Sequence, residues 1–133
     1  MEYEAMYLSP YSWRYGSSEM REIWSEINKR RLWREIWVAL AEVQETYTIV
    51  SPNQVADLHQ HVQEVDVQRS LDIEAVIQHD LMAELEVFAS QCPIGGSILH
   101  LGATSMDIRR CNPHKIFSFI TLEKTLHITS NLN

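Results

Sequence analysis

The sequence predicts an all-α protein. Apolar residues recur at helical spacing through most of the first hundred positions, and no stretch before residue 97 shows the alternation of a half-buried strand. The chain also has only four glycines and four prolines, which are too few turn formers for an all-β sandwich. With 133 residues, 45% hydrophobic and 22% charged, it is long enough for one ordinary domain with a buried core.

The first expected helix follows a polar and aromatic arm, residues 1–17. Ser17 or Ser18 can cap its N-terminus, and Glu19 then places a negative charge favourably in the first turn. We expect this helix to continue to about Tyr47, because apolar residues recur three and four positions apart. The expected apolar face comprises Trp33, Ile36, Trp37, Leu40 and Val43. The charged residues expected on other faces are Arg30, Arg34, Glu35 and Glu42.

Two further helices are expected before a loop that begins at Pro93. The shorter helix begins after Ser51, which caps it, with Pro52 at the first helical position and Gln54 completing a capping box. The longer helix is expected over residues 66–91, with one break along its length. Its apolar stripe comprises Ile77, Leu81, Leu85 and Phe88.

Charge and cysteine content exclude several classes of function. A net charge of −7 opposes non-specific nucleic-acid binding, which depends on Lys and Arg neutralising phosphates, yet a few local basic groups can still hold a small anion. No apolar run approaches the roughly 20 residues of a membrane span, and the N-terminus lacks the basic and apolar regions of a signal peptide. Cys92 and Cys111 have no metal or redox spacing. We therefore expect a cytoplasmic protein with free thiols, no metal and no membrane contact.

The first candidate binding segment is residues 12–18, which contain Arg14 and Tyr15. An arginine offers a fork of donors suited to phosphate or carboxylate, and the tyrosine adds a hydroxyl. The helix start just downstream presents N–H groups to an anion. The alternative is a polar arm with an ordinary helix cap, and the spacing alone does not decide between the two.

The second candidate is the pair His79-Asp80. Histidine is the commonest side chain for proton transfer or anion binding near neutral pH. Adjacent residues of a helix face different directions, so the pair is not a simple dyad. The alternative is a surface or partly buried histidine without a functional role.

The third candidate runs from Gly102 to Asp107. As a helix start, Thr104 caps the helix, Asp107 closes a capping box and Gly102 lets the chain turn. The same geometry, with the hydroxyls of Thr104 and Ser105 beside N–H groups, also binds a carboxylate well. The two interpretations are compatible. Just upstream, His100 in the apolar sequence ILHLG is expected to be a buried, hydrogen-bonded histidine rather than a ligand.

Together and in this order, four segments resemble the N-terminal portion of the adenylosuccinate lyase family, within the fumarase/aspartase superfamily. The segments are SPYSWRYGSSEM, KRRLWREIWVALAEVQ, QHDLMAELEVFASQCP and GGSILHLGATSMDI. The resemblance covers about residues 7–108. It implies the N-terminal helical domain of that superfamily over residues 1–108, followed by a divergent tail, residues 109–133, whose fold stays open.

The resemblance also implies an activity. Members of the family eliminate fumarate from adenylosuccinate and from succinyl-aminoimidazole-carboxamide ribotide, in purine and AMP biosynthesis. They are homotetramers that use no metal and no organic cofactor. The implied partners are therefore a small-molecule nucleotide, adenylosuccinate or AMP, and further copies of the chain, with neither nucleic acid nor membrane.

Site residues are carried over by position in the resemblance. Arg14 and Tyr15 are similar to the pair that holds the substrate phosphate. His79 is similar to an active-site histidine that contacts the substrate, and Asp80 supports that site.

The third matched pair, Thr104 and Ser105, is similar to the residues that bind the succinyl carboxylate. Two catalytic segments of the family are absent from these 133 residues. One is the Thr-His-x-Gln-Pro-Ala-Gln-like segment with the general-acid histidine, and the other is the Ser-Ser-x-Met-Pro-x-Lys-x-Asn-like loop with the catalytic serine. We therefore expect no lyase activity from this chain alone.

The tail RRCNPHKIFSFITLEKTLHITSNLN does not continue the resemblance. Its simplest explanation is a truncated or frameshifted gene product. A rival hypothesis is a non-catalytic helical module that binds itself or a partner through the apolar stripe from Ile77 to Phe88. This stripe is expected to be exposed, because the helices that cover it in the family's bundle are missing. A lyase of the superfamily acting on argininosuccinate or fumarate is a third alternative, which the RYG and QHD elements favour less.

Overall fold

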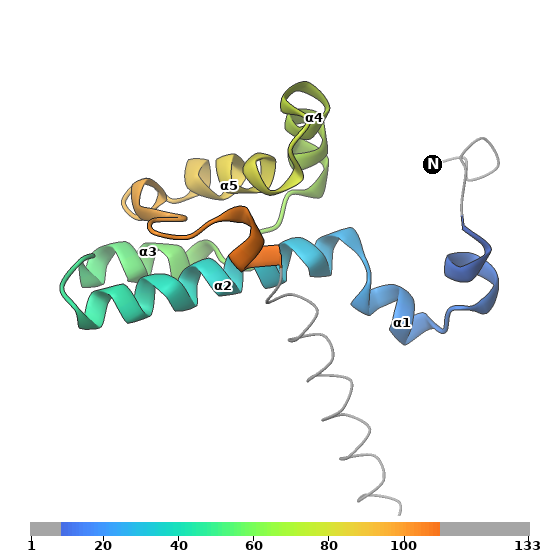
Figure 1. The fold of residues 1–133 in the computed structure, drawn as a ribbon, viewed down its shortest axis with the longest axis horizontal. Helices are drawn as coiled ribbons and strands as arrows, with labels where there is room; N and C mark the ends of the chain where they lie inside the picture. The colour runs from blue at the N-terminus through green and yellow to red at the C-terminus, as the bar shows by residue number, and fades with distance from the viewer. Residues whose placement is uncertain (1–8, 110–133) are drawn as a thin grey trace, which may run out of the picture.

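The structure, a computed structural model, describes residues 9–109 and contains helices but no strand within that range (Figure 1). The prediction of an all-α fold is confirmed. The tail predicted from residue 109 lies outside the described residues apart from Arg109, so the domain division stays a prediction. The elements, in chain order, are the π-helix η2 (Tyr11–Tyr15), α1 (Ser18–Ile23), α2 (Glu26–Thr46), α3 (Pro52–His61), α4 (Val67–Ile77), α5 (Asp80–Gln91) and the 3₁₀ turn η3 (Gly96–Ile98). A last helical turn spans residues 105–109.

The long N-terminal helix predicted up to Tyr47 is two helices, which corrects that expectation. Ser17 caps α1, its hydroxyl accepting the N–H of Met20 at 3.3 Å. Ser25 then caps α2 by accepting the N–H of Asn28 at 3.2 Å, while the amide of Asn28 donates to the carbonyl of Ile23 at 2.7 Å. The helix is interrupted here because these side chains pair with backbone N–H and C=O groups that would bond to each other in a continuous helix.

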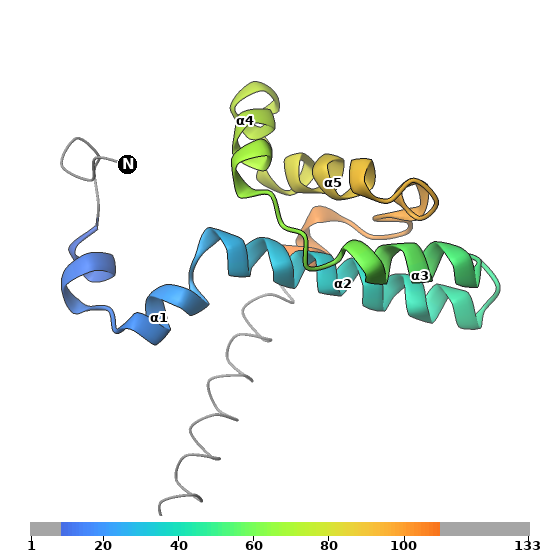
Figure 2. The same ribbon diagram turned by 180° about the vertical axis from the view of Figure 1, so that it is seen from behind.

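Helix α2 is the centre of the molecule. Helices α2 and α3 run antiparallel side by side, α5 lies on the other side of the core, and α4 stands across one end of α5 (Figures 1 and 2). The ring of Trp37 stacks on that of Phe88, with centroids 6.4 Å apart. The buried core comprises Trp33, Trp37, Val38, Ala41, Val50, Val55, Leu58, Leu81, Phe88, Cys92 and Ile108.

The expected apolar face of α2 is therefore partly confirmed. Trp33 and Trp37 are buried, but Val43 is 56% exposed. Val43 lies in the last turn of α2. Val38 and Ala41 are buried instead, and Val43 lies about 200° around the helix from Ala41, so the buried face is rotated from the expected one.

Arg30 and Arg34, which the sequence placed on other faces of α2, are fully buried. That expectation was wrong. The Nε of Arg34 donates to Oε1 of Glu84 at 2.6 Å, and its Nη1 donates to the carbonyls of His61 and Glu64, each at 3.1 Å. A buried charge is tolerated when it is paired and hydrogen-bonded, and helix α5 supplies the carboxylate from 50 positions away.

The second buried arginine ties α2 to α4 as well as to α5. The Nε of Arg30 donates to the hydroxyl of Ser70 at 2.9 Å and lies 3.4 Å from Oε2 of Glu84. Its terminal nitrogens pair with Glu74, at 3.3 Å, and with Glu26. Three helices therefore meet around one ionic network, and this network fixes the position of α4 against α5.

Helix α3 and the loop after α5 were predicted well. Pro52 is the first residue of α3, and the side chain of Gln54 accepts the N–H of Ser51 at 2.9 Å. In the loop, the N–H groups of Ile94 and Gly95 donate to Oδ2 of Asp57 on α3, at 2.8 and 2.7 Å. The loop can approach α3 this closely because Gly95 has no side chain: a Cβ there would lie 2.5 Å from the carbonyl oxygen of Gln54.

The predicted break in the helix over residues 66–91 occurs at Gln78, which has a left-handed φ of 55°. Helix α5 begins in a new direction after it. The apolar stripe proposed across this break is consequently wrong at its first member. Leu81 and Phe88 are fully buried, whereas Ile77, on α4, is 44% exposed.

Candidate functional site

His79 is the N-cap of α5 rather than a residue within a helix. Its Nδ1 accepts the N–H of Met82 at 3.2 Å, and its backbone is extended, with φ −145°. The neutral ring therefore carries its proton on Nε2, which is left as a hydrogen-bond donor. The side chain is 40% exposed, so a ligand can reach it.

The carboxylate of Asp80 has two partners. Its Oδ1 accepts the N–H of Leu81 at 2.7 Å and pairs with the guanidinium of Arg109. The distance from Oδ1 to Nδ1 of His79 is 4.0 Å, which is longer than a hydrogen bond. The expectation that His79 and Asp80 form no simple dyad agrees with this distance.

The segment around Thr104 starts the last described helical turn. Oδ2 of Asp107 accepts the backbone N–H of Thr104 at 2.8 Å and its hydroxyl at 3.2 Å. These two bonds, the backbone one first, lower the pKa of Asp107 below its ordinary value. The helix start predicted here is present, and the Thr104 hydroxyl already has a carboxylate partner.

The contact between Asp80 and Arg109 joins two of the predicted segments. Arg109 lies one helical turn after Ser105, so Ser105 and Asp80 belong to neighbouring helix starts. Four of the six predicted site residues therefore lie on the two segments that this ion pair joins: His79, Asp80, Thr104 and Ser105. These segments are partly exposed, and they contribute an imidazole, two hydroxyls, a guanidinium and the carboxylates of Asp80 and Asp107.

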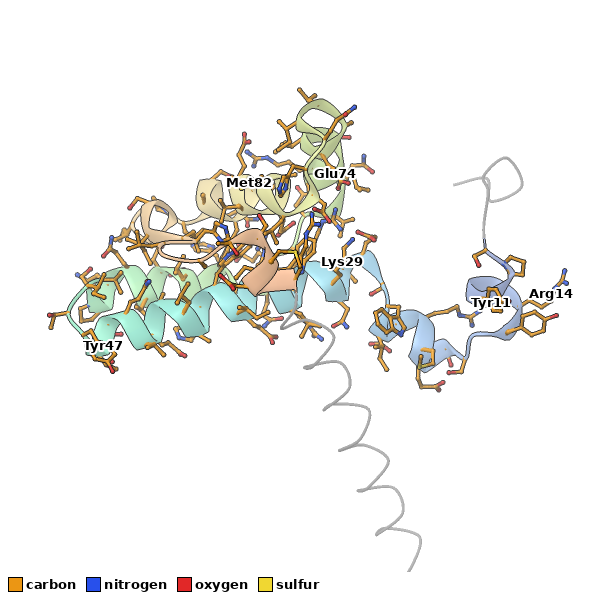
Figure 3. The ribbon with its side chains drawn as sticks, in the orientation of Figure 1. Tyr11, Arg14, Lys29, Tyr47, Glu74 and Met82 are labelled. Carbon is orange, nitrogen blue, oxygen red and sulfur yellow. The ribbon has the colours of Figure 1, made fainter. Side chains whose placement is uncertain are left out.

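The remaining two residues lie elsewhere. Arg14 and Tyr15 belong to η2, and Tyr15 is 70% exposed, with its ring 6.3 Å from that of Tyr11. Figure 3 shows Arg14 on an arm that extends away from α2–α5 beyond α1. Within one copy of the chain, the structure does not bring this pair to His79.

Two features of this region were missed or underestimated. Arg109 stood in the sequence as the first residue of the unmatched tail, and nothing in its local pattern indicated a carboxylate partner 29 positions away. His100 is hydrogen-bonded as expected: its Nδ1 accepts the indole N–H of Trp37 at 3.1 Å. However, His100 is half-buried rather than buried, and its φ of 66° is left-handed.

The described part of the chain contains neither a metal-binding cluster nor a membrane-spanning helix. Within residues 9–109, no group of three or more His, Cys, Asp or Glu side chains is placed to hold a metal ion. None of the helices described there has the length and apolar character needed to cross a membrane.

No family model matches the chain. Among curated proteins it is similar to adenylosuccinate lyases of several organisms. It is 36% identical over 103 residues to the enzyme of Saccharomyces cerevisiae, covering 74% of this chain and 21% of that enzyme. It is 36% identical over 105 residues to that of Pyrococcus horikoshii, and 32% identical over 108 residues to that of Methanocaldococcus jannaschii. The chain spans 23% of the length of each of these two archaeal enzymes.

Proposed function

Because this chain is homologous to a segment of adenylosuccinate lyase, over 74% of its length in the yeast comparison, we propose that it carries part of a lyase substrate site. The reaction of the whole site is the elimination of fumarate from adenylosuccinate or from succinyl-aminoimidazole-carboxamide ribotide. The ligand of this chain is then a nucleotide monophosphate with a succinyl group. A role in purine biosynthesis goes with a cytoplasmic location.

The observation that supports this proposal best is the grouping of His79, Asp80, Thr104 and Ser105, linked by the pairing of Asp80 with Arg109. Imidazole N–H and hydroxyl groups at helix starts are suited to carboxylates, because the helix dipole and the side chains both favour negative charge there. Their chemistry fits the succinyl part of the substrate. In this proposal, the hydroxyl of Ser105 binds a carboxylate, the hydroxyl of Thr104 turns from Asp107 to the same ligand, and His79 donates from Nε2.

The phosphate is assigned to the arm that bears Arg14 and Tyr15. A guanidinium binds phosphate through paired N–H donors, and a tyrosine hydroxyl adds another donor. Since the arm extends away from α5, which His79 caps, we propose that one copy does not hold both the phosphate group and the succinyl group in this arrangement. We propose that a complete site combines segments from several chains, either further copies or longer lyase subunits.

Lyase activity is not proposed for these 133 residues alone. The general-acid histidine segment and the catalytic serine loop of the family are absent from the sequence. Binding and orientation of the substrate supply part of a rate enhancement, but proton abstraction and donation need positioned groups of their own. The chain is therefore a binding portion.

A nucleotide titration tests the proposal. Calorimetry with adenylosuccinate and with AMP is expected to show weak binding to the purified chain, reduced by Arg14→Ala for both ligands. His79→Ala is expected to reduce binding of adenylosuccinate more than binding of AMP. Failure of both ligands to bind at millimolar concentration would overturn the proposal, and release of fumarate by the chain alone would overturn its inactive status.

One observation favours the second candidate, a helical module that associates through an apolar surface. Trp24, Ile27 and Val76 are 60%, 56% and 82% exposed. Exposed apolar surface of this kind favours association. The stripe first proposed for this role is not available, because Leu81 and Phe88 are covered within the chain. A tight oligomer in analytical ultracentrifugation, together with no nucleotide binding, would favour this candidate.

A further inference from the structure

The loop that precedes Thr104 is held to α2 by two side chains. The indole N–H of Trp37 donates to Nδ1 of His100 at 3.1 Å, and the amide of Gln44 donates to the carbonyl of Leu101 at 2.8 Å. Trp37 and Gln44 are seven positions apart on α2, so they lie two turns apart on the same side of that helix. Two consecutive residues of the loop, His100 and Leu101, are thus bonded to α2.

The contact between Trp37 and His100 constrains a side chain as well as the backbone. Trp37 is 1% exposed, and the two rings are perpendicular, with centroids 6.1 Å apart. An indole nitrogen can only donate, and leaving it buried without an acceptor is unfavourable. The neutral His100 ring must therefore keep Nδ1 unprotonated and carry its proton on Nε2.

The backbone of this loop needs such support. His100 and Gly102 have left-handed φ values of 66° and 74°. Glycine adopts this conformation freely, but a histidine does so only at a cost that its surroundings must offset. On the far side of the loop, Ile108 is buried in the core, so the last helical turn is anchored at its other end.

From these contacts we infer that Trp37 is a positioning residue for Thr104 and Ser105. Its indole N–H fixes the tautomer and the ring of His100 and so holds the loop that leads to Thr104. The last helical turn, whose Arg109 pairs with Asp80, starts from this loop. Gln44, two turns further along α2, supports the same loop through its bond to the carbonyl of Leu101. This inference rests on the proposed function for its effect on binding, but its structural part is measurable without any ligand.

The structural part is tested by NMR on the full chain. Long-range ¹H–¹⁵N spectra of the wild type are expected to show the neutral His100 ring protonated at Nε2. In Trp37→Phe, which keeps an aromatic ring in the core but removes the N–H, the Nδ1–H tautomer should become populated, and backbone amides 101–105 should exchange with solvent roughly tenfold faster. Trp24→Phe is the matched control, since Trp24 is 60% exposed, and it should change neither measurement.

Binding supplies the second readout. Trp37→Phe is expected to weaken adenylosuccinate binding by roughly tenfold, about the effect of one lost hydrogen bond, while AMP binding stays within twofold of the wild type. The reason is that the loop is assigned to the succinyl group and not to the phosphate. A uniform loss for both ligands, with loss of the folded circular dichroism signal, would mean that Trp37 acts through stability alone and would overturn the inference.

The two proposals fail separately. If the wild-type chain binds neither nucleotide, the proposed function fails, and the tautomer and exchange measurements still decide the role of Trp37. If the wild type binds adenylosuccinate but Trp37→Phe leaves the His100 tautomer and the loop exchange unchanged, the positioning role is overturned. In that case the proposed function stands.

Discussion

The Nε of Arg34 on α2 lies 2.6 Å from Oε1 of Glu84 on α5, and both side chains are fully buried. The guanidinium also lies over the ring of Phe88, with its central carbon 4.6 Å from the ring centroid. A charge pair without solvent contact is held in place by the high cost of separating it. This pair, together with Arg30, holds α4 and α5 against α2. It therefore also positions His79, which lies between α4 and α5.

Replacing Glu84 by Gln should destabilise the chain strongly. It leaves two buried arginines with one carboxylate fewer, and removing one partner of a buried pair costs about 3–5 kcal/mol. Urea unfolding followed by circular dichroism measures this as a lower free energy of unfolding. Glu86→Gln, at an exposed position of the same helix, should change the free energy by less than about 0.5 kcal/mol.

If Glu84→Gln fails to fold, the double variant Arg34→Met with Glu84→Leu tests the same ion pair. Removing both charges leaves no uncompensated partner at this pair, so the double variant should be more stable than Glu84→Gln. A double variant as unstable as the single one would contradict the role of the ion pair.

His79 should contribute separately to stability and to binding. His79→Ala removes the acceptor for the N–H of Met82, a helix cap that is typically worth about 1 kcal/mol. His79→Asn supplies another good cap, so it should recover most of the free energy of unfolding. If His79 contacts the substrate, His79→Asn should still bind adenylosuccinate more weakly than the wild type. Full recovery of binding in calorimetry would show that the histidine acts as a cap and nothing more.

Gly95→Ala should destabilise the contact between the loop and α3. The added Cβ would lie 2.5 Å from the carbonyl oxygen of Gln54 and 2.8 Å from Cγ of Leu58, distances that force the loop to move. Overpacking of this kind costs about 1–3 kcal/mol, measured by thermal or urea unfolding. Gly102→Asn is the comparison, because asparagine tolerates a left-handed φ and the nearest atom to a Cβ there is 4.0 Å away. Equal losses in the two variants would contradict the steric explanation.

Cys92 should be chemically inert in the folded chain. Burial, followed by the charge of Asp57, raises the pKa of its thiol to about 12, so the reactive thiolate is scarce at neutral pH. In a Cys111→Ser variant, where Cys92 is the single thiol, Ellman's reagent should react slowly without urea and rapidly in urea. Equally fast reaction in both conditions would show that the thiol is accessible in the native state.

Asp107 should link the last helical turn to pH. The N–H and the hydroxyl of Thr104 lower the pKa of this carboxyl in the folded chain, so its contribution to stability is present above the unfolded pKa, about 3.9, and is lost as the pH falls through the folded pKa. NMR titration of the Asp107 carboxyl should give a pKa below that ordinary value. Asp107→Asn should therefore be less stable than the wild type at pH 7, with the difference closing in acid.

Local signals in the sequence were sufficient for most helix boundaries. Ser51, Pro52 and Gln54 predicted the start of α3, and Thr104 with Asp107 predicted the start of the last turn, because a cap depends on residues three positions apart. The break at Ser25 was missed, since the apolar spacing on both sides suits one long helix. Ser25 can cap a helix only if the backbone leaves the helical conformation at that residue, and no local pattern in the sequence indicates that it does.

The candidate site was predictable in its members but not in its arrangement. His79, Asp80, Thr104 and Ser105 were all selected from the sequence, yet nothing local indicated that Arg109 would join the two segments through Asp80. The distant position of Arg14 was likewise not expected. Which segments meet depends on how the helices pack, and packing is decided by many contacts between residues far apart in the chain.

The all-α class, the caps at Ser17, Ser51 and Thr104, and the homology to a segment of adenylosuccinate lyase follow from the sequence alone. These follow from residue patterns within a few positions of each other, or from the similarity of the sequence itself. The burial of Arg30 and Arg34, the bond from Trp37 to His100 and the pairing of Arg109 with Asp80 are features of the tertiary structure. These features rest on contacts between residues 27 to 63 positions apart, and such contacts form only when burial of the whole core offsets the entropy lost in closing the chain between them.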